Sequence, residues 1–147
     1  MEQNIQETLA IIKPDGIKNS EKIINMIYQN GLKIKEYKLT MLSKEIVREH
    51  YNTLLDKPFY GRLEAFMTSD YVILMVLTGE NAVEKLRNLM GPTNSQLAAK
   101  GTIRGEFGTD ITINAIHGSD SVENAKIEID RFFNHDIKKK TLKPQNI

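Results

Sequence analysis

The sequence contains no cysteine, which excludes disulfide bonds and thiolate chemistry and fits a reducing compartment. It has no excess of either charge: the net charge is +1 over 147 residues, so no overall field would attract nucleic acid or a membrane. The longest hydrophobic run, Tyr71 to Leu77, is far too short to cross a bilayer. The N-terminal residues, an acid and several amides, do not form a signal peptide. We therefore expect a cytoplasmic protein.

The composition is that of an ordinary globular protein. Hydrophobic residues make up 40% and charged residues 27% of the chain, and the length allows a sizeable core. We expect one domain over residues 1–147, with a core from about 7 to 133. The tail over 138–147 begins with three lysines and shows no periodicity.

The spacing of hydrophobic residues predicts alternating strands and helices. Strands are expected at 8–12, 32–40, 71–78 and 111–116, and helices at 20–30, 43–51, 58–67, 81–90 and 121–133. The third strand is the most hydrophobic and is expected in the centre of the sheet, with the second near an edge. This order indicates an α/β (α+β) fold of the ferredoxin-like, split βαβ kind, with a four-stranded antiparallel sheet covered by helices. Residues 91–110 are expected to form a long loop, a feature that is often functional.

The segment around His117 is the most informative. An apolar run stops at this histidine, and Gly118 and three helix-capping residue types follow before the helical spacing begins. His117 is therefore expected where a strand ends and a helix starts, and backbone N–H groups at a helix start attract anions. A histidine there could carry a phosphoryl group, although a histidine after a strand is more often structural.

Phosphoryl transfer through histidine has specific requirements. Its nucleophile is a neutral imidazole, which the unperturbed histidine pKa of about 6.5 provides at neutral pH. It also needs a partner for the ring and cationic or N–H donors around the phosphates. The sequence offers candidates for these roles, and for a flat surface under a base: Glu128, Lys13, Arg87, Thr93, Arg104 and Phe59.

Four motifs together resemble the nucleoside diphosphate kinase family. They are Thr-Leu-Ala-Ile-Ile-Lys-Pro-Asp-Gly at 8–16, Gly-Pro-Thr-Asn at 91–94, Gly-Thr-Ile-Arg-Gly at 101–105 and Asn-Ala-Ile-His-Gly-Ser-Asp-Ser at 114–121. The resemblance runs from about Glu7 to Phe133, and the last motif is close to diagnostic of the family.

The resemblance implies an activity and a set of roles. Members move the γ-phosphate of a nucleoside triphosphate, mainly ATP, to a nucleoside diphosphate by a ping-pong reaction through phosphohistidine, with Mg²⁺ bound through the nucleotide phosphates. By motif, His117 would carry the phosphoryl group on Nδ1, with Tyr51 and Glu128 near that nitrogen and Ser119 holding the carboxylate. The nucleotide would be bound through its phosphates by Lys13, Arg87, Thr93 and Arg104, through its sugar by Lys13 and Asn114, and through its base by Phe59 and Ile111. Because stacking tolerates every base, we expect broad base and sugar specificity.

The family assembles as tetramers or hexamers built from a common dimer, so the resemblance implies a homo-oligomer of one of these kinds. The chain departs from the family where it has Ser95 instead of the proline that many members carry after the Thr-Asn pair. That loop contributes to subunit contacts in the hexamers, so the departure leaves the choice between tetramer and hexamer open.

Two other functions fit the same fold. One is a module that binds single-stranded nucleic acid on exposed sheet aromatics, but the third strand lacks interleaved aromatics and the net charge is near zero. The other is an inactive relative kept as a scaffold, which nothing in the sequence favours. His50 and His135 lack the company of other motif residues, and we expect them to be ordinary surface or packing residues.

Overall fold

The computed structural model describes residues 4–134 and is built around a four-stranded antiparallel sheet with the strand order β2-β3-β1-β4. The strands are β1 (Ile5–Ile12), β2 (Lys33–Thr40), β3 (Val72–Glu80) and β4 (Ile116–Gly118). The predicted α+β class and ferredoxin-like arrangement are therefore confirmed, with β3 inside the sheet and β2 at its edge.

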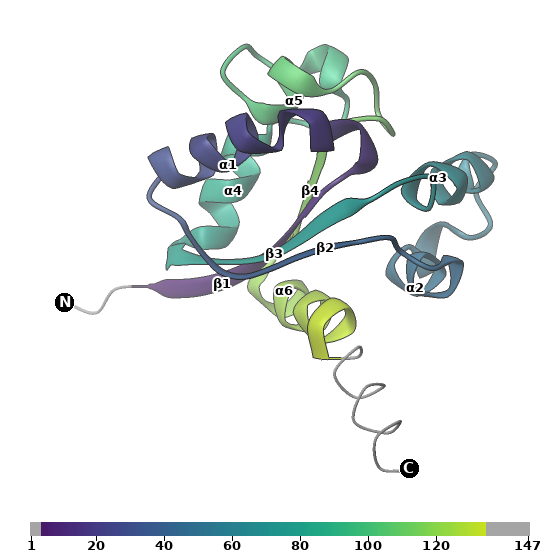
Figure 1. The fold of residues 1–147 in the computed structure, drawn as a ribbon, viewed down its shortest axis with the longest axis horizontal. Coiled ribbons are helices and arrows are strands. Elements are labelled where there is room, and N and C mark those ends of the chain that lie inside the picture. Colours follow the sequence, from purple (N-terminus) through teal and green to yellow (C-terminus); the bar gives the residue numbers. More distant parts are fainter. Residues whose placement is uncertain (1–3, 135–147) are drawn as a thin grey trace.

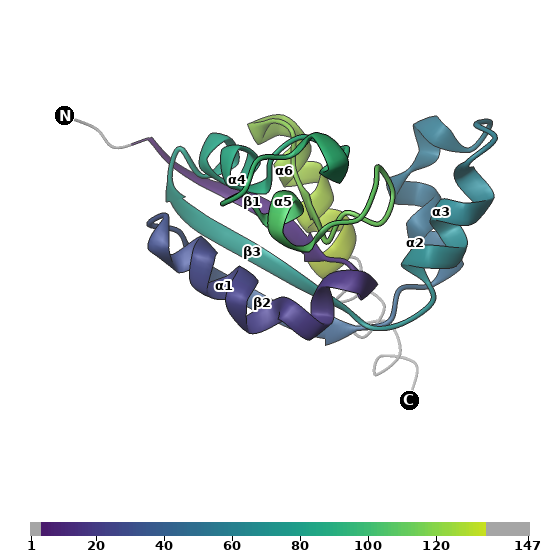
Figure 2. The ribbon, with the colours of Figure 1, turned by 90° about the horizontal axis from the view of Figure 1, so that it is seen from above.

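Helices lie against both faces of this sheet and beyond one of its ends. One face carries α1 (Ser20–Gln29), α4 (Ala82–Met90) and α5 (Ile103–Phe107), and the other carries α6 (Val122–Ile129) (Figure 1). The pair α2 (Lys44–His50) and α3 (Tyr60–Met67) lies at the end of the sheet away from the N-terminus, as both views show (Figure 2). Short 3-10 segments at Pro14–Asn19, Asn52–Leu54 and Ser95–Leu97 and a π-helical turn at Asp130–Asn134 complete the structure.

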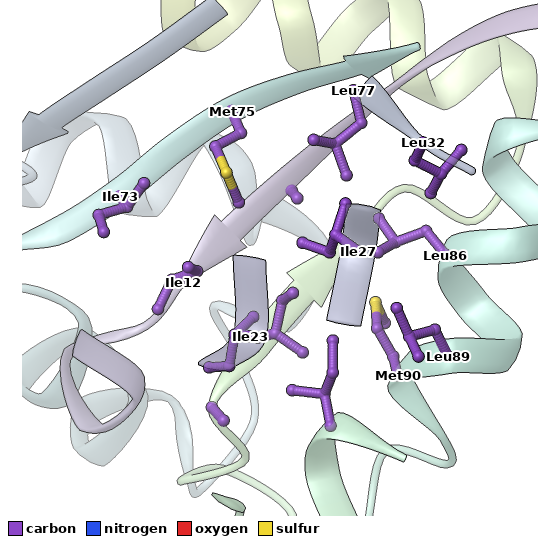
Figure 3. Packing of buried hydrophobic residues seen from close by; sticks show 14 of the residues in the cluster. Ile12, Ile23, Ile27, Leu32, Ile73, Met75, Leu77, Leu86, Leu89 and Met90 are labelled. Atoms are coloured by element: carbon purple, nitrogen blue, oxygen red, sulfur yellow. The ribbon is translucent and has the colours of Figure 1, made fainter. Parts of the chain in front are cut away.

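Alternation along β1 and β3 divides the core into two clusters, because successive strand residues point to opposite faces. Ala10 and Ile12 of β1 join Ile73, Met75 and Leu77 of β3 beneath α1 and α4 (Figure 3). The residues between them, with side chains of α2, α3 and the π-helical turn, form the second cluster, which includes Leu9, Ile11, Leu74, Val76, Val47, Leu63 and Phe132. Six consecutive residues at the start of β3 are buried, which explains the hydrophobic run that the sequence shows there.

Serine hydroxyls cap the first turns of two helices. The Ser43 hydroxyl accepts a hydrogen bond from Ile46 N at 3.2 Å, and the Ser121 hydroxyl accepts one from Asn124 N at 3.1 Å. Ser20 does not cap α1 but is its first residue, because the 3-10 segment after β1 already turns the chain.

The sequence prediction is wrong about two segments near His117. The stretch 111–115 is not a strand, since the Asp110 carboxylate accepts hydrogen bonds from Thr112 N and Ile113 N and folds it into a turn. The loop at 91–110 is not structureless, because Asn94 and Thr102 accept hydrogen bonds from backbone N–H groups and start the 3-10 segment and α5. The helix predicted over 121–133 is α-helical only over Val122–Ile129, and a π-helical turn at Asp130–Asn134 follows it.

Among residues 4–134, no helix is long and apolar enough to cross a membrane. The basic tail over 138–147 and His135 lie outside the described residues.

The fold predicts a steric requirement at Gly118. A Cβ atom there would lie 2.5 Å from Met90 Sδ and 2.8 Å from Leu86 Cδ2, so β4 packs directly on α4. We expect Gly118→Ala to lower the free energy of unfolding by about 1–3 kcal/mol, the usual cost of overpacking, in urea denaturation. Gly61→Ala is the control, because a Cβ at Gly61 meets nothing within 4 Å. Equal stabilities of the two variants would contradict this account.

Candidate active site

His117 lies in the middle of β4, not after a strand as the sequence indicated. It pairs with Ile11 of β1, and its ring therefore points to the face of the sheet that α6 covers. Because the strand continues to Gly118, the first N–H groups of α6 belong to residues further along the chain. The helix start is thus not the nearest partner of the His117 ring.

A carboxylate and a hydroxyl support the His117 ring. His117 Nε2 lies 3.0 Å from Glu128 Oε1, and the Ser119 hydroxyl donates to the same oxygen at 2.7 Å. Ser119 is fully buried, and its hydroxyl oxygen accepts from Leu9 N at 3.2 Å. Burial raises the pKa of Glu128, but the hydrogen bonds from His117 and Ser119 outweigh it and leave that pKa below its usual value. The family resemblance implies that Glu128 lies near Nδ1, but in the structure Glu128 lies at Nε2.

Two buried cations lie close to one another beside this group. Lys13 is 6% exposed and Arg104 is 7% exposed, and Arg87 on α4 faces the same cavity. Burial and the neighbouring Arg104 charge lower the pKa of Lys13 to about 7. Burial and the Arg87 charge lower the pKa of Arg104 to about 10. This grouping of like positive charges favours the binding of an anion in the site.

Backbone and amide groups hold the two buried cations in place. Lys13 Nζ donates to Asn114 Oδ1 at 2.7 Å, and the Asn114 amide donates to the carbonyl oxygens of Thr93 and Ile111. Arg104 donates from Nη1 to Gly91 O at 3.0 Å and from Nη2 to Ile116 O at 2.9 Å. Three segments that are distant in the sequence are therefore joined around the cations.

These side chains line one cavity of about 740 Å³, a size typical of small-molecule sites. Every residue that the sequence analysis proposed for the site lines it, apart from Ser119, which lies behind Glu128: Lys13, Tyr51, Phe59, Arg87, Thr93, Arg104, Ile111, Asn114, His117 and Glu128. Phe59 and Ile111 are 47% and 60% exposed and both line this cavity, so a ligand bound there would cover apolar surface.

Some residues that line the cavity carry no motif signal in the sequence. Arg62 lies in α3, which begins directly after Phe59, and donates to Asp110 Oδ2 at 3.0 Å, so it links this helix to the turn carrying Ile111. The helical spacing of Phe59 and Arg62 was the signal that could have revealed this contact. Leu54, Met90 and Asp120 also line the cavity.

Two polar groups at the site have no protein partner within the described residues. The Tyr51 hydroxyl and Arg104 Nε are buried and make no hydrogen bond there. Burial raises the pKa of Tyr51, so the hydroxyl keeps its proton. Unsatisfied buried donors cost stability, and a bound ligand with oxygen acceptors would satisfy both groups.

His50 is not the ordinary packing residue that the sequence analysis expected. Its ring lies 4.6 Å from the His117 ring, centre to centre, at 84° between the planes. It also contacts the rings of Tyr51 and Phe132. The helical spacing of Ile46, Val47 and His50 puts them on one side of the predicted helix, but no motif pairs His50 with His117.

His50, His117 and Glu128 offer ligand atoms within 4.8 Å of one another, a set that resembles a two-histidine, one-carboxylate metal site. One contact argues against a metal there. Arg131 Nη1 lies 2.8 Å from His50 Nδ1, and because a guanidinium only donates, Nδ1 accepts and the proton of neutral His50 is on Nε2. A metal would require that proton to leave, so these residues do not fit a resident metal ion.

Comparison with known proteins identifies the family of this chain. The family model of nucleoside diphosphate kinase matches residues 6–137. The chain belongs to the nucleoside diphosphate kinase family.

Individual family members are similar over nearly their whole length. The nucleoside diphosphate kinases of Wolbachia sp. subsp. Drosophila simulans and of Campylobacter fetus are each 51% identical over 131 residues, 88% of this chain and 94% and 96% of theirs. The Aquifex aeolicus nucleoside diphosphate kinase structure matches with a TM-score of 0.83 at 40% identity, over 88% of this chain and 95% of that one. The Halobacterium salinarum nucleoside diphosphate kinase in complex with CDP matches with a TM-score of 0.84 at 39% identity, over 89% of each chain.

The lowered pKa of Lys13 predicts proton uptake on binding a nucleotide, with CDP as the probe. The pKa of Lys13 in the free protein is about 7, so at higher pH this amine is mostly neutral. A phosphate beside it raises that pKa, so binding takes up a proton and affinity falls as pH rises from about 7. Titration calorimetry at about pH 8.5, in buffers of different ionisation enthalpy, should show uptake approaching one proton, well above the ligand's own pKa range.

Lys13→Met is the matched variant for this measurement and should lose the uptake. A binding enthalpy that does not depend on the buffer in the unaltered protein would contradict the assignment. Equal uptake in the variant would assign the proton to another group.

Proposed function

We propose that the chain catalyses the nucleoside diphosphate kinase reaction with His117 Nδ1 as the phosphoryl carrier. The observation that carries this proposal is the His117–Glu128–Ser119 chain in a cavity lined by Lys13 and Arg104. Since Glu128 occupies Nε2, the nitrogen left for a nucleophile is Nδ1. Both the nucleophile and an anion-binding surface are therefore present in one cavity.

The electrostatics of the site suit a polyphosphate. Lys13, Arg87 and Arg104 bring positive charge to the cavity, and the Thr93 and Tyr51 hydroxyls add neutral donors. In phosphoryl transfer, positioning and charge stabilisation supply most of the rate enhancement. The unsatisfied Arg104 Nε and Tyr51 hydroxyl would then be paired by phosphate oxygens, which accounts for their lack of protein partners.

The transfer proceeds in two half-reactions. The Nδ1 lone pair forms a bond to the γ-phosphorus of the triphosphate while the bond to the β–γ bridging oxygen breaks, and the diphosphate leaves with that electron pair. The imidazole ring gains positive charge, and the ionised Glu128 carboxylate stabilises it through the Nε2 proton. In the second half-reaction, a terminal oxygen of another nucleoside diphosphate attacks the same phosphorus and His117 leaves as the neutral ring.

Magnesium enters this scheme as part of the nucleotide substrate. Of the carboxylates that line the cavity, Glu128 is bound to His117 and Ser119, while Asp120 accepts from Asn124 Nδ2 at 2.5 Å. The described site thus offers donors to the phosphates rather than a ligand cage for a metal. This supports Mg²⁺ held on the phosphates.

The base is placed between Phe59 and Ile111, and the sugar near Lys13 and Asn114. An aromatic and an aliphatic side chain contact the faces of a base, not its hydrogen-bonding edge. Specificity for the base and for the sugar is therefore expected to be broad.

The alternative function receives less support from the fold. A module of this kind binds single strands on an exposed sheet face, but both faces of β1 and β3 are buried under the two core clusters. Assembly into a tetramer or hexamer stays a prediction, and the exposed Tyr37 and Leu39 on the edge strand β2 and the exposed Leu97 support it. A cytoplasmic location also stays a prediction.

Labelling with γ-labelled ATP and Mg²⁺ tests the proposal directly. We expect the protein to retain a label that survives alkali and is lost in acid, as phosphohistidine is, and to pass it to an added nucleoside diphosphate. His117→Ala should take no label. A wild-type protein that stays unlabelled, or a variant that takes as much label, would refute the role of His117.

A further inference from the structure

Arg131 contacts His50 and Glu49 at the end of α2 through a nearly buried guanidinium. Its side chain is 12% exposed, although arginine side chains are mostly exposed in proteins. Nη1 donates to His50 Nδ1 at 2.8 Å, and Nε donates to Glu49 Oε2 at 3.1 Å. Two hydrogen bonds to adjacent residues of α2 hold the planar group in one orientation.

The contact between Arg131 and His50 determines where the His50 proton is. The guanidinium has donors only, so Nδ1 must present its lone pair, and neutral His50 then carries its proton on Nε2. A second proton on Nδ1 would break this hydrogen bond. Burial, then the charges of His117, Arg131 and Lys13, hold the pKa of His50 well below its usual value.

The surroundings of His50 leave it one orientation. Its ring stands nearly perpendicular to His117, at 4.6 Å, and against Phe132 at 5.0 Å and 67°. Such edge contacts are favourable between rings at this separation. A ring nitrogen of His50 also lies within 4.8 Å of a carboxylate oxygen of Glu128, the residue that contacts His117. A charged His50 would therefore compete with His117 for that carboxylate.

We propose that Arg131 is a positioning residue, which fixes His50 as the neutral Nε2–H tautomer and so keeps the His50 ring against His117 without a second positive charge at Glu128. This proposal rests on the proposed role of His117 in the reaction. The groups that face His50 are His117 from β4, Glu128 from α6, Lys13 after β1, Arg131 from the π-helical turn, and Tyr51 and Glu49 beside it. Arg131 is the one that sets the proton's position.

The tautomer can be observed without any assay of activity. The chain has 3 histidines, so ¹⁵N spectra of the full-length protein labelled at histidine can be assigned with single substitutions. In the wild type we expect His50 to show a protonated Nε2 and an unprotonated Nδ1 from about pH 6 to 8.5. Arg131→Met should lose this fixed pattern and show mixed tautomers or protonation at the acid end, while Arg131→Lys, which keeps a charged donor, should restore part of it.

Single-turnover phosphorylation by ATP gives the second readout. Arg131→Met should phosphorylate about 10- to 100-fold more slowly, the range found when partners that orient metal-bound histidines are removed. The loss should be larger at about pH 6 than at about pH 8.5, because a protonated His50 draws Glu128 away from His117. Arg48→Met is the matched control: it removes an arginine of α2 that is paired with Glu64 and should leave both readouts unchanged.

The two readouts separate this proposal from the proposed function. A wild-type His50 with its proton on Nδ1 would overturn the proposal. It would also be overturned if Arg131→Met and Arg131→Lys kept the wild-type tautomer, rate and pH dependence. If the wild type takes no phosphoryl group from ATP, the role of His117 fails whatever the spectra of His50 show.

Discussion

The pairing of β1 with β4 is the contact on which the candidate site depends. Ile11 lies opposite His117, Leu9 exchanges hydrogen bonds with the backbone and hydroxyl of Ser119, and Lys13 N donates to Ala115 O as the pair ends. β1 is inside the sheet and buried on both faces, so these partners are held by the core. His117, the Ser119 hydroxyl that donates to Glu128, and Lys13 are therefore positioned by a single strand.

The buried cations beside this strand carry an electrostatic cost. Lys13 and Arg104 are buried with only neutral oxygen acceptors, and each lies near another cation. The carboxylates of Asp15 and Asp110 offset only part of the lowering of the Lys13 pKa, and the unsatisfied donors at Tyr51 and Arg104 add to the cost of burial. Such an arrangement makes physical sense where a polyanion completes it, because the fixed donors then need no reorganisation when charge develops during transfer.

The sequence predicts much of the fold and of the candidate site. The segments that it does not predict have physical explanations. Hydrophobic alternation located β1 and β3, since both are long and buried, and the motifs selected residues that do meet in one cavity. Alternation failed at 111–115, where the side chain of Asp110 offers the backbone a turn that competes with a strand. Helical spacing puts His50 on the same side of α2 as Ile46 and Val47, but its contact with His117 depends on how α2 packs against the end of the sheet.

One face of the segment that begins with α6 links the states of both histidines. Glu128 and Arg131 are three residues apart, and Phe132 is four from Glu128, so all three project from one side of the last turns. Glu128 contacts His117, while Arg131 and Phe132 contact His50. The sequence assigned this face to the core through Phe132 and Ile129, and it does anchor there. Burial of Phe132 thereby fixes the rotation of the turn, and that rotation aims the Glu128 carboxylate at His117 and the Arg131 guanidinium at His50.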